Sequence, residues 1–193
     1  MGALGDGRRI FETLAEAYGE STRAYHNTEH LRHCLAELDC HLRLADRPEE
    51  VEAALWFHDG IYVPGRSDNE DRSARLAEDA LREGGVAAET ARRVGRLVLA
   101  TRHASPVEDK DARLVCDIDL AILGGSPAEF DRFESRIREE YRLVPAPLYR
   151  EARSNVLRGF LLRPSIYQTE ELKAQYEIHA RQNLERTLSA LSE

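Results

Sequence analysis

The sequence has few cysteines, no long apolar run and no excess of basic residues. Its three cysteines, Cys34, Cys40 and Cys116, are too few for a disulfide framework, and none forms a C-x-x-C zinc or redox pattern. We therefore expect them to be small buried residues in a reducing compartment. No stretch approaches the roughly 18 apolar residues of a membrane span, and the first residues lack the apolar run of a secretion signal. These absences predict a soluble, cytoplasmic protein with no membrane partner.

Charge narrows the possible partners further. The formal net charge is -8, from 35 acidic and 27 basic residues. A net negative charge disfavours extended electrostatic binding to a phosphate backbone, so no nucleic-acid polymer is expected as a partner. A small-molecule substrate is compatible with this charge, and the sequence leaves the oligomeric state undetermined.

Hydrophobic periodicity predicts the fold class. Apolar residues recur every three or four positions between short Gly, Pro, Ser and Asp interruptions, and no run alternates with period two. At 193 residues the chain suits one sizeable core, so we predict a single all-α domain, a helical bundle. Helices are expected over about 7–19, 88–101, 109–123 and 169–191, with further starts at Asn27 or Thr28, Pro48, Asp68 and Ser126, and one more helix holding Leu148 to Leu161.

The pair His58-Asp59 stands at the end of an apolar run, residues 53–57. A helix this apolar is expected to pack in the core, where burying an imidazole and a carboxylate costs free energy unless each has a partner. A bound cation would be such a partner. The alternative is that Asp59 caps the next segment and His58 is a hydrogen-bonded core histidine.

Other candidate ligands lie on two more predicted helices. His30 falls in the first turn of the helix that begins near Asn27, beside its apolar face, although it can also be an ordinary helix-start histidine. Asp117 and Asp119 lie within the apolar stretch 114–123, where a carboxylate without a partner is costly. They point ~200° apart on a helix, so one of them is expected to be a ligand. The more apolar helical neighbours of Asp119 favour Asp119.

Two further residues are candidates for catalysis. His103 follows the helix predicted over 88–101, where it can interact with the helix dipole or approach a leaving group. Glu70 lies in the first turn of the helix that begins near Asp68, from which it can face the same site. The intervening loop, residues 61–68, is where groups that contact substrate are expected.

Together these segments resemble the HD-domain superfamily of metal-dependent phosphohydrolases, and within it a bacterial group described as predicted phosphohydrolases. The resemblance rests on four motifs in order: Tyr-His-Asn-Thr-Glu-His at 25–30, Phe-His-Asp at 57–59, Asn-Glu at 69–70, and Asp-Ile-Asp-Leu-Ala-Ile-Leu-Gly at 117–124. The metal-site core would span about residues 23–124. The helices over about 126–191 are then expected to be scaffold.

The resemblance implies a ligand set and a reaction. The metal ligands would be His30, His58, Asp59 and either Asp117 or Asp119. Such a mixed set suits a divalent ion, Mn, Fe, Co, Ni, Mg or Zn, whose identity stays open. A metal-activated water would hydrolyse a nucleotide or another small phosphate ester, with His103 as proton donor and Glu70 orienting the water. The alternative is a non-catalytic regulatory module of the same fold that binds metal or nucleotide.

Overall fold

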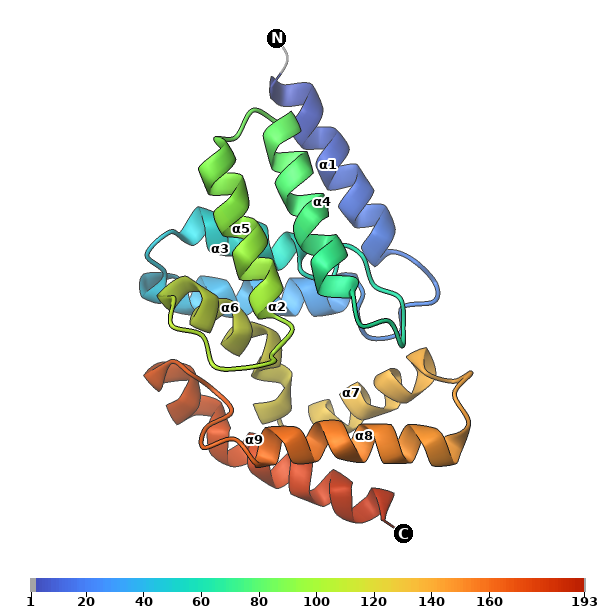
Figure 1. The fold of residues 1–193 in the computed structure, drawn as a ribbon. Coiled ribbons are helices and arrows are strands. Elements are labelled where there is room, and N and C mark those ends of the chain that lie inside the picture. Colours follow the sequence, from blue (N-terminus) through green and yellow to red (C-terminus); the bar gives the residue numbers. More distant parts are fainter. Residues whose placement is uncertain (1–2, 193) are drawn as a thin grey trace. The chain divides into compact units, whose positions relative to one another are not determined.

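The computed structural model describes residues 3–192, with side chains from residue 7 onward. Every regular element in this range is helical, which confirms the all-α prediction (Figure 1). The α-helices are α1 (Ala3–Tyr18), α2 (Thr28–His41), α3 (Pro48–Phe57), α4 (Asn69–Glu83), α5 (Ala88–Ala100), α6 (Lys110–Asp119), α7 (Pro127–Glu140), α8 (Ala146–Leu161) and α9 (Glu170–Leu191). Two 3₁₀ segments, η1 (Leu42–Leu44) and η2 (Leu120–Gly124), follow α2 and α6.

The chain forms two compact units, Met1–Asp119 and Leu120–Glu193. The sequence was interpreted as one domain, with the metal-site core ending near residue 124 and scaffold helices following it. All the candidate site residues lie in the first unit. Among the described residues of both units, no helix is long and apolar enough to cross a bilayer.

Helix α3 occupies the middle of the first unit. It packs against α2, α4, α5 and α6, and its residues Val51, Ala54 and Leu55 are completely buried. Burial on several sides explains why the second half of this helix, residues 53–57, is apolar throughout rather than along a single stripe. As a result, His58 and Asp59, which follow the helix directly, are placed inside the unit.

The start of α3 is anchored by a carboxylate from α6. Asp111 is buried, and its two oxygens accept hydrogen bonds from the backbone N–H groups of Asp46 (2.7 Å) and Arg47 (3.1 Å). Pro48 at the first helical position has no N–H to satisfy. Asp111 therefore acts as a cap supplied by a distant helix, and it ties α3, which precedes His58 and Asp59, to α6, which ends at Asp119.

Replacing Asp111 with alanine is expected to lower the free energy of unfolding by about 1–3 kcal/mol, because two partly buried backbone hydrogen bonds lose their acceptor. Asp111→Asn keeps one acceptor oxygen and should lose less. Chemical denaturation of both variants measures the difference. Equal stability of wild type and Asp111→Ala would contradict this role.

Helix α2 begins with a local cap, as the sequence predicts. The side-chain oxygen of Asn27 accepts from the N–H of Glu29 (2.9 Å), and its amide donates to the carbonyl of Ala24 (2.9 Å). This double use of one side chain fixes the turn in front of the helix. His30 is consequently held in the first turn of α2, where it is buried.

The helix predicted over 109–123 is shorter than expected. Regular α-helix stops at Asp119, and residues 120–124 wind more tightly as η2. Carbonyls in and beside η2 find partners outside a helical ladder: the Tyr167 hydroxyl donates to Leu120 (2.9 Å), and the Asn183 amide donates to Leu123 and Gly125 (2.9 Å each). These partners come from far along the chain, so the helical periodicity could not reveal them. Asp119 is the last residue of α6.

The second unit contains α7, α8 and α9. Helix α7 starts with the predicted capping box, in which Ser126 and Glu129 each accept from the backbone N–H of the other. Gly124 lies against α9, so close that a Cβ atom there would be 2.5 Å from the Cβ of Tyr176. A side chain of any size at position 124 would therefore disrupt the contact of η2 with α9.

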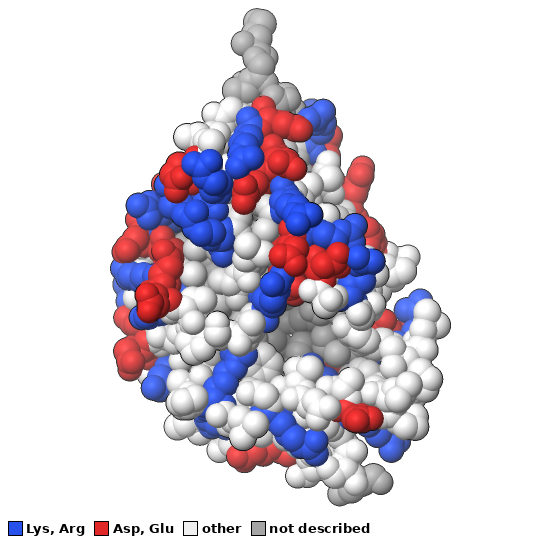
Figure 2. Space-filling model, in the orientation of Figure 1, with Lys and Arg blue, Asp and Glu red and all other residues white. Residues whose placement is uncertain are grey.

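The visible surface of the first unit carries both signs of charge. Figure 2 shows basic and acidic side chains interspersed over α1, α4 and α5, where ion pairs such as Arg9–Glu83 and Arg82–Glu78 form. This face has no broad patch of one sign of the kind that grips a nucleic-acid backbone.

Candidate metal centre

Four of the predicted ligands converge in the first unit, from α2, from the residues after α3 and from the end of α6. The Nε2 atoms of His30 and His58 lie 3.1 Å apart. Asp59 Oδ2 is 3.0 Å from His58 Nε2 and 3.6 Å from His30 Nε2. Asp119 Oδ1 is 3.3 Å from His30 Nε2 and 3.6 Å from His58 Nε2. Two imidazole nitrogens and two carboxylate oxygens thus face one common point.

The cluster has a buried side and a side that solvent reaches. The side chains of His30 and His58 are each 1% exposed, whereas those of Asp59 and Asp119 are 15% and 18% exposed. Nitrogen donors therefore form the floor of the cluster and carboxylate oxygens its rim. The two carboxylates are thus the donors nearest to solvent.

Hydrogen bonds outside the cluster fix the orientation of its donors. His58 Nδ1 lies 2.7 Å from the carbonyl oxygen of Leu55, which can only accept, so Nδ1 carries the proton and donates it. This leaves Nε2 as the atom that faces the other donors. Contacts of this kind, from a ligand histidine to a carbonyl, are the usual support of metal-binding imidazoles.

The backbone around Asp59 is also held. Arg23, whose side chain is 3% exposed, donates to the carbonyl oxygens of Asp59 (2.5 Å) and Gly60 (3.4 Å). The N–H of Asp59 donates to the hydroxyl of Tyr18 (3.3 Å). These contacts fix the turn after α3 and, with it, the direction of the Asp59 carboxylate.

His103 supports Asp119 from the rim of the cluster. Its Nε2 lies 2.8 Å from Asp119 Oδ2, the oxygen that does not face His30 and His58. His103 also has a φ of 53°, in the left-handed region that is unfavourable for a residue with a side chain. Strain of this kind concentrates at functional sites because the surroundings enforce it. In this geometry His103 contacts a candidate ligand, and the proton-donor role that the sequence indicates stays a prediction.

The two histidines respond in opposite ways to this environment. Burial lowers the pKa of His30 below its ordinary value, and the nearby Asp119 only partly offsets it. Burial also opposes a charge on His58, but Asp59 and Asp119 outweigh it and raise the pKa of His58 well above the ordinary value. The environment therefore favours the neutral form of His30 and the charged form of His58, and their 3.1 Å separation disfavours charge on both at once.

The carboxylates are held in their charged form. Burial alone would raise the pKa of both, but His58 lowers the pKa of Asp59, and His103, His30 and His58 lower that of Asp119. Both groups are therefore anionic at neutral pH, as metal ligands must be.

Metal binding is expected to tighten as the pH rises, because a cation must displace a proton from His58. The raised pKa of His58 means that its imidazole is charged at and below its ordinary value of 6.5. Each pH unit below that raised pKa should weaken the apparent affinity about tenfold. Calorimetric titration with a divalent cation between about pH 6 and pH 8, in buffers of different ionisation enthalpy, measures both affinity and proton release. A flat affinity with no proton release would contradict the expectation.

Glu70 and Asp117, the other candidates from the sequence, have different surroundings. Glu70 lies 3.9 Å from Arg102, which pairs more closely with Asp71 (2.6 Å). Asp117 is fully buried on α6, whereas Asp119 Oδ1 lies 3.3 Å and 3.6 Å from the ring nitrogens of His30 and His58. Because residues two apart on a helix point to nearly opposite sides, Asp119 is the candidate ligand of the two.

Cys34 is a donor that the sequence analysis did not assign to the site. It is completely buried, and its Sγ lies 3.7 Å from Nε2 and 3.8 Å from Nδ1 of His30. One ligand atom from each of His30, Cys34, His58 and Asp119 lies within 4.8 Å of the others, so this buried group can hold a metal ion. The pattern that could have indicated it is the spacing of four residues between His30 and Cys34, which places both on one face of α2.

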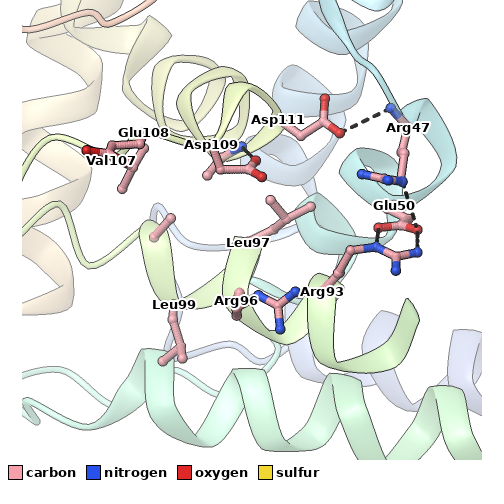
Figure 3. A pocket seen from close by; sticks show the side chains of 12 residues that line it. Arg47, Glu50, Arg93, Arg96, Leu97, Leu99, Val107, Glu108, Asp109 and Asp111 are labelled. Carbon is pink, nitrogen blue, oxygen red and sulfur yellow. Dashed lines mark hydrogen bonds and ion pairs between the residues drawn. The ribbon is translucent and has the colours of Figure 1, made fainter. Parts of the chain in front are cut away.

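A separate cavity of about 360 Å³ lies beside α3, α5 and α6. Figure 3 shows two of the contacts in its lining: Arg93 forms a two-pronged ion pair with Glu50, and Asp111 accepts from the backbone of Arg47. Its lining includes no histidine or cysteine. The cavity therefore lacks the donor chemistry of the histidine cluster, and we place the candidate site at the cluster.

Comparisons of the chain with protein-family models, with curated proteins and with solved structures found no significant match. The functional argument consequently depends on the residues of the cluster themselves.

Proposed function

We propose that the protein is a metal-dependent phosphohydrolase of the HD-domain type, acting on a nucleotide or another small phosphate ester. The observation that carries the proposal is the meeting of His30, His58, Asp59 and Asp119, with contacts of 3.0 to 3.6 Å between nitrogen and oxygen donors. Two carboxylates with depressed pKa values and two buried imidazoles are a donor set that suits a divalent cation.

The residues present fit such a cation. Without one, the Nε2 atoms of two buried imidazoles face each other at 3.1 Å, between two anionic carboxylates. With one, all four groups would have a common partner, and their hydrogen bonds to Leu55 and His103 would orient them. A divalent cation at this position would activate water and polarise a phosphoryl oxygen.

The chain's own residues contribute orientation and access. His58 is aligned by its bond to Leu55, and Asp119 is aligned by His103, so the donors are set before substrate arrives. The rim at Asp59 and Asp119, whose side chains are partly exposed, is where a substrate phosphate would enter. His103, which is 13% exposed at this rim, would donate a hydrogen bond to Asp119 and hold its second oxygen away from the substrate.

The test is to measure metal content and hydrolysis together. Protein purified without chelator is expected to contain close to one divalent ion per chain, and to hydrolyse at least one member of a panel of nucleotides and phosphomonoesters. Chelation should abolish the activity, and adding back a divalent ion should restore it. Metal and nucleotide binding without turnover across the panel would replace the proposal by a regulatory binding module. If the protein bound no metal even at high concentrations of divalent ion, both the hydrolase and the regulatory-module proposals would be wrong.

A further inference from the structure

We propose that the Cys34 thiolate is a ligand of the metal and makes the site select a thiophilic ion such as zinc rather than magnesium. This inference rests on the proposed metal site and deepens it. Its basis is the group His30, Cys34, His58 and Asp119, whose ligand atoms lie within 4.8 Å of one another.

The separations among the imidazole, carboxylate and sulfur donors are close to those around a single zinc ion. Bonds of about 2.0–2.1 Å to nitrogen or oxygen and 2.3 Å to sulfur place donors about 3.3 Å apart, or about 3.6 Å when one of them is sulfur. The separation of the two imidazole nitrogens is 3.1 Å, Asp119 lies 3.3 Å and 3.6 Å from them, and Cys34 Sγ lies 3.7 Å from His30 Nε2. Cys34 Sγ lies almost equally far from both ring nitrogens of His30, so its side chain would turn toward Nε2 for these atoms to bind one ion.

The position of Cys34 distinguishes it from the carboxylates. It is fully buried beside His30 and His58, so the floor of the cluster has two nitrogen donors and one sulfur donor. Asp59 and Asp119, on the side that solvent reaches, complete the set. Magnesium prefers oxygen ligands and an octahedral site, whereas imidazole and thiolate donors favour zinc, cobalt or iron.

Coordination requires the sulfur to lose its proton. Metal binding exchanges the S–H bond for a bond from sulfur to the cation, and the proton passes to the buffer. No electron is transferred and no further reactant is needed. A merely space-filling Cys34 would keep its proton whether or not metal is present, so the two roles differ in an observable way.

Cobalt(II) is the probe that reports on both the site and the sulfur. We expect cobalt-loaded wild type to show ligand-field bands in the visible range and a sulfur-to-cobalt charge-transfer band in the near ultraviolet. The double variant Cys40→Ser/Cys116→Ser keeps Cys34 as its one cysteine and should retain both features. Cys34→Ser should keep ligand-field bands, lose the charge-transfer band and bind zinc at least about tenfold more weakly.

The outcomes separate the two proposals. Ligand-field bands without charge transfer in the double variant would overturn the role of Cys34 while leaving the metal site in place. No cobalt bands in wild type would overturn the site and the role of Cys34 with it. Because the double variant contains Cys34 unchanged, this result stands even if Cys34→Ser fails to fold. Displacement of cobalt by an equal concentration of magnesium would also contradict the selectivity.

Discussion

Replacing His58 with alanine is expected to weaken divalent metal binding by at least about 100-fold and to reduce phosphate-ester hydrolysis to background. Mutating even a residue that only supports a ligand typically weakens metal affinity by about 10–100-fold, and His58 contributes a donor atom directly. Its Nε2 lies 3.0 to 3.6 Å from donors of His30, Asp59 and Asp119, so its loss removes the central member of the cluster. Calorimetric titration and elemental analysis measure the effect on binding.

A matched control is His179→Ala, because His179 is an exposed histidine on α9, in the second unit. This variant should bind metal and turn over substrate like wild type. Circular dichroism of both variants checks that the helices are intact. If His58→Ala bound metal as tightly as His179→Ala, the cluster would not be the metal site, and the proposed hydrolase would lose its basis.

Replacing Gly124 with alanine is expected to destabilise the second unit by about 1–3 kcal/mol, and to lower the melting temperature by roughly 3 to 10 °C. The new Cβ would lie 2.5 Å from the Cβ and 2.8 Å from the carbonyl oxygen of Tyr176. Neither atom belongs to the flexible end of a side chain, so the backbone of η2 or α9 must shift. Differential scanning calorimetry measures the change.

Gly159→Ala is the comparison for this effect. Gly159 lies within α8, and a Cβ there meets no atom within 4 Å. Because alanine favours the helix over glycine, this variant should gain about 0.5–1 kcal/mol. Opposite signs at two glycines would show that crowding, and not the loss of glycine itself, causes the effect at position 124. A stable Gly124→Ala protein would mean that η2 and α9 are packed less closely than described.

Local sequence patterns were sufficient to predict the helices and several of their starts. Asn27 caps α2, Pro48 opens α3 and Ser126 forms a capping box with Glu129, each through neighbours within three or four residues. The tight turns of η2 depend instead on Tyr167 and Asn183, which are 47 and 60 residues away from the carbonyls they contact. Contacts over such distances leave no periodic pattern in the chain.

The candidate site was likewise predictable only in part from local sequence. The sequence indicated His30, His58, Asp59 and Asp119 because each is an ionisable residue within an apolar segment, and their order matched a known family. It gave no indication that His103 would contact Asp119 across a turn with left-handed backbone. Cys34 was overlooked for a chemical reason, because an apolar helical stripe accommodates a thiol as readily as leucine.

Helix α2, the turn after α3 and the end of α6 bring together residues from 30 to 119 of the chain in this cluster. A cation held there would act as a cross-link, and its binding energy would count toward folding. Cells short of that metal would then carry more of the chain in an open, protease-sensitive form, so its abundance would follow metal supply even where its synthesis is constant.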